Sequence, residues 1–260
     1  MVARMKTYGL TTVGAMVVLA ALAAGTRPSW AEDFRVENKM FVGNESTPKS
    51  ESTTIFHQGI VYDYLEKPAE VIVFDKARMR FILLDPGRRV RAELTTDEVK
   101  GLTNDLRVRA AAQDKELHKF LAHPKFDERV DEKTRELVFD SPWLTYRVAA
   151  EPAEVSEMAR QYREFSDWYV QLNTRFVPGY KQTFARMAIN EVLEKRGELP
   201  REVHLTVKSK VPFQKTTARS QHQVVRRLVQ SDRDRVAQTD QFMAIFQPVS
   251  MDEYQKRPGS

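Results

Sequence analysis

The residues best suited to acid–base or metal chemistry in this chain are its five histidines, and their spacing matches no ligand pattern. His118 and His123 are five positions apart, whereas two metal ligands on one helical face stand four apart. His204 and His222 fall in two strands that we expect to be neighbours. We interpret both as polar side chains on a solvated sheet face, because most strand histidines are structural. We therefore expect no metal and no other cofactor.

Nucleophilic and phosphate-binding motifs are missing from the sequence, which has no Gly-x-Ser-x-Gly, no P-loop, no Gly-x-Gly-x-x-Gly and no cysteine. A hydrolase that uses two carboxylates is the least favoured alternative. It would need two of four acidic residues to converge in one cleft: Asp63, Glu70, Asp75 and Asp85. Asp75 and Asp85 occupy turn positions that aspartate takes for conformational reasons, and alternation places Asp63 toward solvent. We expect no catalytic residue and no enzymatic activity.

Aromatic side chains are the richer signal, because they gather in segments expected to form a sheet and the helix packed on it. Such side chains either fill a core or line a cavity for an apolar ligand. The candidate lining residues are Phe56, Tyr62, Phe74, Phe81 and Tyr146. Trp143, Tyr162 and Trp168 bear on a second alternative, since outward-facing aromatic residues would mark a surface for a protein partner.

The elements that must position these residues begin with strands. A first strand is expected at 34–42. Short runs rich in β-branched and aromatic residues then predict consecutive strands from 53 to 94. Tight connections at Gln58-Gly59, Asp75–Arg78 and Asp85–Arg88 favour an antiparallel meander. Later strands are expected at 136–139, 144–148, 203–208 and 222–229.

Helices follow the meander. One is expected from Thr95, a capping residue, to Leu121, and a second over 155–176, where apolar positions step by three and four. Two more are expected at 180–195 and 232–246. Together the elements predict an α+β fold in one domain over residues 32–260. We expect a curved antiparallel sheet, a meander or half-barrel, with the helices packed on one face.

The first 31 residues have the layout of a secretory signal peptide. Arg4 and Lys6 precede an apolar run from Tyr8 to Ala24, and Ser29-Trp30-Ala31 supplies a small-residue cleavage motif. We expect cleavage near Ala31 and an extracytoplasmic protein, periplasmic or secreted, with an uncleaved N-terminal membrane anchor as the alternative. No later stretch is long and apolar enough to span a membrane as a helix.

Removal of this segment also changes the charge. Without its three basic residues the 41 Lys and Arg become 38, against 36 Asp and Glu, so the formal net charge falls from +5 to +2. A nearly balanced surface argues against a nucleic-acid partner. The missing cysteines leave no disulfide, so stability must come from a packed core.

Residues 53–94 resemble one known family. The segment Val71–Leu94 runs strand, tight turn, strand ending in Asp-Pro, then an alternating strand, and Tyr62–Pro68 supplies the strand and proline-marked connection before it. This order is similar to the central hairpin of the LolA-like periplasmic lipoprotein carriers. The resemblance implies an open, strongly curved antiparallel sheet, helices on its concave face and lipid chains bound in between.

The leading hypothesis is thus an exported, non-enzymatic envelope protein that binds an apolar or lipid-like ligand, or a protein partner, in a cleft between sheet and helices. The first alternative is a structural or interaction protein of the cell envelope with the same fold and a filled core.

Overall fold

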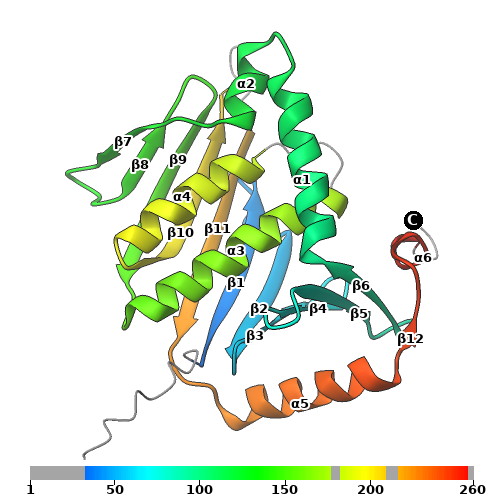
Figure 1. Ribbon diagram of the computed structural model, residues 1–260. Coiled ribbons are helices and arrows are strands. Elements are labelled where there is room, and N and C mark those ends of the chain that lie inside the picture. Colours follow the sequence, from blue (N-terminus) through cyan, green and yellow to red (C-terminus); the bar gives the residue numbers. More distant parts are fainter. Residues whose placement is uncertain (1–32, 177–181, 209–215, 257–260) are drawn as a thin grey trace, which may run out of the picture.

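The computed structural model describes residues 33–176, 182–208 and 216–256. The predicted signal peptide at 1–31 lies outside the described residues. In the described part the chain forms a twelve-stranded open sheet and six helices, so the expected α+β fold is confirmed (Figure 1). The strands are β1 Phe34–Val42, β2 Ser50–His57, β3 Ile60–Leu65, β4 Glu70–Asp75, β5 Arg80–Asp85, β6 Val90–Thr95, β7 Asp127–Val130, β8 Leu137–Asp140, β9 Leu144–Pro152, β10 Glu198–Val207, β11 Thr216–Val225 and β12 Gln247–Pro248. The helices are α1 Thr96–Ala111, α2 Glu116–Ala122, α3 Ser156–Phe176, α4 Thr183–Lys195, α5 Gln230–Ile245 and α6 Met251–Gln255.

The sheet consists of two meanders joined at one seam. Its strand order is β12-β6-β5-β4-β3-β2-β1-β11-β10-β9-β8-β7, and every pairing is antiparallel except that of β12 with β6. At the seam, the first described strand pairs with a strand from the end of the chain, and Asn38 lies opposite His222. Residues far apart in sequence therefore share the centre of the sheet.

The expected turns of the first meander are confirmed, and their chemistry is local. Gln58 and Gly59 both have positive φ, 50° and 79°, as the two-residue turn between β2 and β3 requires. In the next turns the Asp75 carboxylate accepts a hydrogen bond from the backbone N–H of Arg78 at 3.1 Å, and Asp85 accepts one from Arg88 at 2.9 Å. These carboxylates thus hold turns, as their positions in the sequence indicate.

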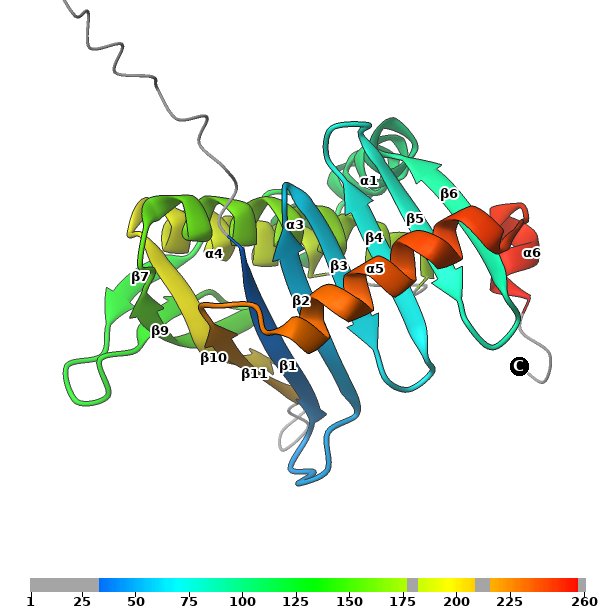
Figure 2. The same ribbon diagram turned by 90° about the horizontal axis from the view of Figure 1, so that it is seen from below.

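Helices α1 to α4 cover one face of the sheet, but α5 crosses the opposite face (Figure 2). This departs from the expectation that the helices gather on one face. The strands β4 and β5 explain the arrangement, because their residues are buried alternately on both sides: Ile72 and Phe74 under α3, Val71 and Val73 under α5. A continuous apolar run of this kind is typical of a strand covered on both faces.

Three smaller differences have physical causes. The expected helix from Thr95 to Leu121 is two helices, because no apolar position lies between Ala112 and Leu117 to hold a continuous turn against the sheet. Strand β7 was not expected, since all of its residues are exposed. Strand β11 ends at Val225 rather than Val229, which instead precedes α5 and is 50% exposed.

Candidate functional site

A cavity of about 480 Å³ lies between the centre of the sheet and the helices α3 and α4. Its floor comes from inward-facing residues of β1, β2, β3, β9, β10 and β11, and its roof from the two helices. Most of the wall surface is apolar, and the apolar side chains on it include Met40, Val42, Tyr146, Phe165, Val170, Val203, Leu205, Val207 and Ala218. Met40 and Val42 are also among the exposed large apolar residues, at 42% and 39%, so the cavity reaches the surface there.

The space exists because the floor residues at the seam are small or polar. Ser50 and Ser52 on β2 and Ala218 and Ser220 on β11 point toward α3 from the two strands that flank β1, and none is long enough to meet the helix. Further along the sheet, large side chains fill the same layer: Phe74 stacks on Phe81 with ring centroids 4.8 Å apart. The sheet is therefore packed solid under one half of α3 and hollow under the other.

A row of polar side chains crosses four strands on the cavity floor. The Ser220 hydroxyl lies 2.9 Å from Nε2 of His222, whose Nδ1 lies 2.8 Å from Oδ1 of Asn38. Asn38 Nδ2 donates to Thr54 Oγ1 at 2.9 Å, and Thr54 donates to Asp63 Oδ1 at 2.7 Å. Because the Asn38 amide donates to Thr54, its oxygen must accept, which assigns the His222 proton to Nδ1. Every donor in the row thus points toward Asp63.

Asp63 is the buried end of this row, with only 2% of the residue exposed. Burial raises the pKa of its carboxyl, and hydrogen bonds from Thr54, Ser52 and Tyr169 oppose the rise. Three hydroxyl donors around one carboxylate compensate much of the desolvation of its charge. The sequence-based expectation that Asp63 faces solvent is therefore wrong. It alternates toward α3, and solvent is excluded there.

His222 is held neutral. Burial lowers the pKa of its ring to about 3, and the nearby positive charge of Arg186 adds to the effect. Ser220, His222 and Asn38 have the order of a nucleophile, a base and an orienting group. A base with so low a pKa is poorly matched to proton abstraction near neutral pH, because the imidazolium would form beside Arg186. The arrangement is suited to hydrogen bonding rather than to nucleophilic catalysis.

The five predicted lining residues do not gather in one place. Tyr146 lines the cavity. Phe56, Phe74 and Phe81 lie in the packed core beside it, where Phe56 meets Phe165 edge-on at 5.9 Å. Tyr62 faces the opposite side of the sheet, and its hydroxyl donates to Asp240 of α5 at 3.1 Å. The sequence analysis did not predict the polar row on the cavity floor. The alternating polar residues of β1 and β11 could have indicated it.

Among the other candidates for chemistry, Glu70 lies within electrostatic range of Asp63 and accepts a hydrogen bond from the Tyr254 hydroxyl at 2.6 Å, whereas the rest are dispersed. Asp75 faces the α5 side and pairs with Arg78 at 2.8 Å, whereas Asp63 faces α3, so these two carboxylates do not converge. His204 lies opposite Arg219 and pairs with Glu202 at 2.7 Å on the solvated face, as expected, whereas His222 is in the cavity. The two histidines therefore do not meet. Within the described ranges no group of three or more His, Asp or Glu side chains could hold a metal ion.

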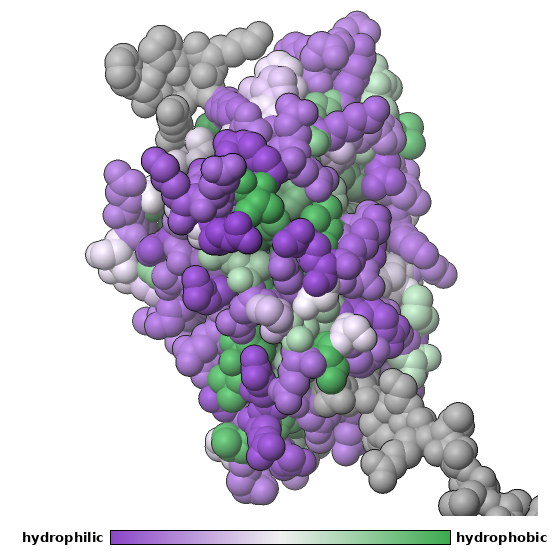
Figure 3. Space-filling view, turned by 90° about the vertical axis from the view of Figure 1, so that its left-hand side faces the viewer, coloured by the Kyte–Doolittle hydropathy of each residue, from purple (hydrophilic) through white to green (hydrophobic). Residues whose placement is uncertain are grey.

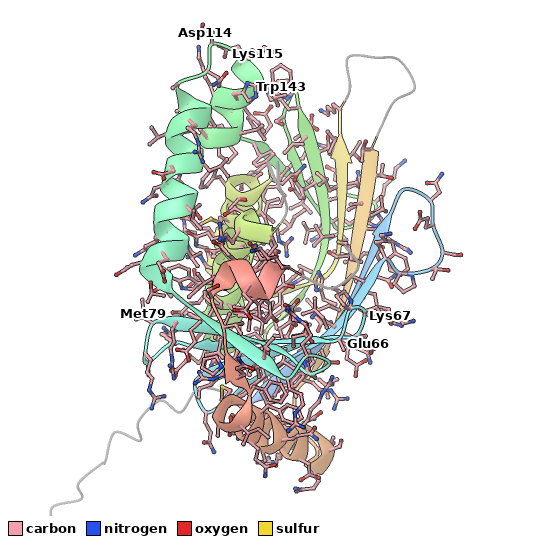
Figure 4. The ribbon with its side chains drawn as sticks, turned by 90° about the vertical axis from the view of Figure 1, so that its right-hand side faces the viewer. Glu66, Lys67, Met79, Asp114, Lys115 and Trp143 are labelled. Carbon is pink, nitrogen blue, oxygen red and sulfur yellow. The ribbon has the colours of Figure 1, made fainter. Side chains whose placement is uncertain are left out.

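The aromatic residues that could have marked a partner surface are turned inward. Tyr162 is 9% exposed, and Trp168 packs against Phe81 with centroids 6.3 Å apart. Trp143 is partly buried against the core of β8, β9 and α4, at the end of the molecule where Asp114 and Lys115 lie (Figure 4). The side shown in Figure 3 is mostly hydrophilic, with apolar side chains in separate small groups.

Comparisons with known proteins add no family. No protein-family model matches the sequence, and no curated protein matches it significantly. Among the described residues, no helix has both the length and the apolar character needed to cross a membrane.

Proposed function

We propose that this chain is an exported, non-enzymatic protein that binds one largely apolar small molecule in the cavity between its curved sheet and the helices α3 and α4. The observation that carries the proposal is the cavity itself. Its volume of about 480 Å³ falls within the range of about 300–1,000 Å³ typical of small-molecule sites. Most of its wall surface is apolar, with a polar row on the floor and further polar groups on the roof, which is the usual composition of such a site.

Two further observations support a carrier rather than a scaffold with a filled core. Met40 and Val42 leave apolar surface exposed at the opening, where a ligand would cover it. The resemblance of residues 53–94 to LolA-like carriers implies a ligand in the same place, between the concave face of a sheet and its helices. The layout of residues 1–31 supports export from the cytoplasm, with cleavage near Ala31.

Native mass spectrometry of the full chain, expressed with its own N-terminal segment and purified without detergent, tests the binding proposal. We expect extra mass that is lost on denaturation and that extracts into organic solvent. A bare monomer mass, even after incubation with lipid extract, would contradict ligand binding and favour the interaction protein.

N-terminal sequencing of the same sample tests export. We expect Glu32 as the first residue of protein recovered from the periplasmic fraction. Protein that keeps Met1 and sediments with membranes would favour the anchored alternative.

A further inference from the structure

Arg186 is a partly buried cation with no acidic partner in direct contact. It lines the roof of the cavity from α4, and no described carboxylate lies within the 4 Å of an ion pair. The hydroxyl of Tyr162 is its hydrogen-bond partner. On the facing helix α3, by contrast, Arg163 pairs with both Asp167 and Glu194. Arg186 is thus the guanidinium that remains for a ligand.

The neighbours of Arg186 suit an anion. His222 is neutral, and Ser166, Ser220 and Gln182 offer uncharged polar groups on the same cavity wall. Asp167 is within electrostatic range of Arg186, but its carboxylate already accepts from Asn190 at 2.8 Å and pairs with Arg163 at 3.3 Å. A cation withdrawn from water is costly without a counter-charge, and a bound carboxylate or phosphate would supply one with two parallel hydrogen bonds.

Among the described residues, Asp63 is the only carboxylate on the cavity wall, and it does not oppose the binding of an anion at Arg186. Asp63 lies three strands away from β11 along the polar row, and Thr54, Ser52 and Tyr169 hydrogen-bond to it. On the other side of β11 from Asp63 the wall is apolar, from Val203 and Leu205 on β10 to Tyr146 on β9. A ligand with an anionic head at Arg186 could lay an aliphatic chain on these residues.

We infer that the ligand is an amphiphile with a single aliphatic chain and an anionic head, carboxylate or phosphate, that pairs with Arg186. This inference rests on the proposed function and names the chemical class of its ligand. Arg186 would recognise the charged head alone. The head could belong to a fatty acid or to a lysophospholipid with a terminal phosphate, and the experiment compares these two.

The test measures binding of four probes to the delipidated full-length protein by titration calorimetry. The probes are palmitate, methyl palmitate, lysophosphatidate and lysophosphatidylcholine. At least one anionic probe should bind about tenfold or more tightly than its neutral or zwitterionic counterpart, since a hydrogen bond to a charged group contributes about 1.5–3 kcal/mol. The tighter of palmitate and lysophosphatidate identifies the source of the head.

Arg186→Met should remove this preference, and Arg186→Lys should restore part of it. Arg160→Met is the matched control, because Arg160 on α3 pairs with Glu157 outside the cavity lining while the net charge changes equally. If Arg186→Met does not fold, the comparison within the two pairs of probes on the unaltered protein still decides. Equal binding within both pairs would overturn this inference and leave the proposed function standing. Binding of no probe would overturn both.

Discussion

The Nδ1 atom of His222 lies 2.8 Å from the Oδ1 atom of Asn38, across the seam where β11 meets β1. The pair fixes the tautomer of a ring that is buried and neutral. In an unfolded chain the same ring takes up a proton near pH 6.5, whereas in the native protein its pKa is lowered to about 3.

Acid should therefore destabilise the protein through His222. Between pH 6.5 and about 3 the unfolded chain binds a proton that the native chain does not, so the free energy of unfolding falls as the pH falls. One such group contributes a slope of up to about 1.4 kcal/mol per pH unit. Chemical unfolding at pH 7, 6 and 5 should show a shallower slope for His222→Gln than for the wild type.

His204→Gln is the matched control, since His204 lies on the solvated face of the neighbouring strand. It should keep the wild-type slope because His222 is still present. The raised pKa of Asp63 acts in the opposite sense and is common to all three proteins, so it cancels in the comparison. Equal slopes for wild type and His222→Gln would contradict the buried neutral ring.

The hydroxyl of Thr54 is the link that satisfies both Asn38 and Asp63. Thr54→Val keeps the side-chain volume and removes the hydroxyl, which leaves a buried carboxylate with one donor fewer. We expect a loss of about 1–3 kcal/mol in the free energy of unfolding, measured with urea. Thr53→Val, one residue earlier and on the other face of β2, should change it by less than about 0.5 kcal/mol.

Helix α5 should be needed for stability, because it covers the second apolar face of β3, β4 and β5. Phe246 is 4% exposed and its ring lies 4.7 Å from that of Phe242. Phe246→Ala should cost about 3–5 kcal/mol in urea unfolding. Its neighbour Ile245 is 62% exposed, and Ile245→Ala should be nearly neutral. Similar losses for the two variants would show that α5 does not pack as described.

Ser220 and His222 should not hydrolyse esters. The low pKa of His222 makes it a weak base, so p-nitrophenyl butyrate should react no faster with the protein than with buffer. Ser220→Ala should give the same rate as the wild type. Saturable hydrolysis that disappears in Ser220→Ala would instead assign the row a catalytic role.

Local chemistry explains which parts of the fold could be predicted. The meander turns at Asp75 and Asp85, the cap at Thr95 and the amphipathic α3 each depend on residues within a few positions. The position of α5 could not be predicted, because a continuous apolar run does not reveal which element covers each face of the strand. The site depended on pairing between β1 and β11, whose residues lie 184 positions apart at Asn38 and His222. No local pattern reports that pairing.

The cavity could not be predicted for the same reason, because the residues that form it lie far apart in the sequence. Single serines and a threonine in separate strands are ordinary surface residues when each strand is considered alone. Placed side by side they leave a volume, and alternation made His222 and Asp63 part of its floor rather than of the surface. The predicted aromatic lining was drawn from strands β2 to β5, where the rings fill the layer instead.

The seam between β1 and β11 also sets an order of events during synthesis. Strands β2 to β6 each pair with the strand next to them in the sequence. Strand β1, by contrast, can pair with β11 only after residues 216–225 have been synthesised. Contacts this remote in sequence close slowly, because the loop between them must first be ordered. Export, as proposed, requires a chain that has not yet completed its fold. This sheet stays incomplete until residues 216–225, in the last fifth of the chain, have been synthesised.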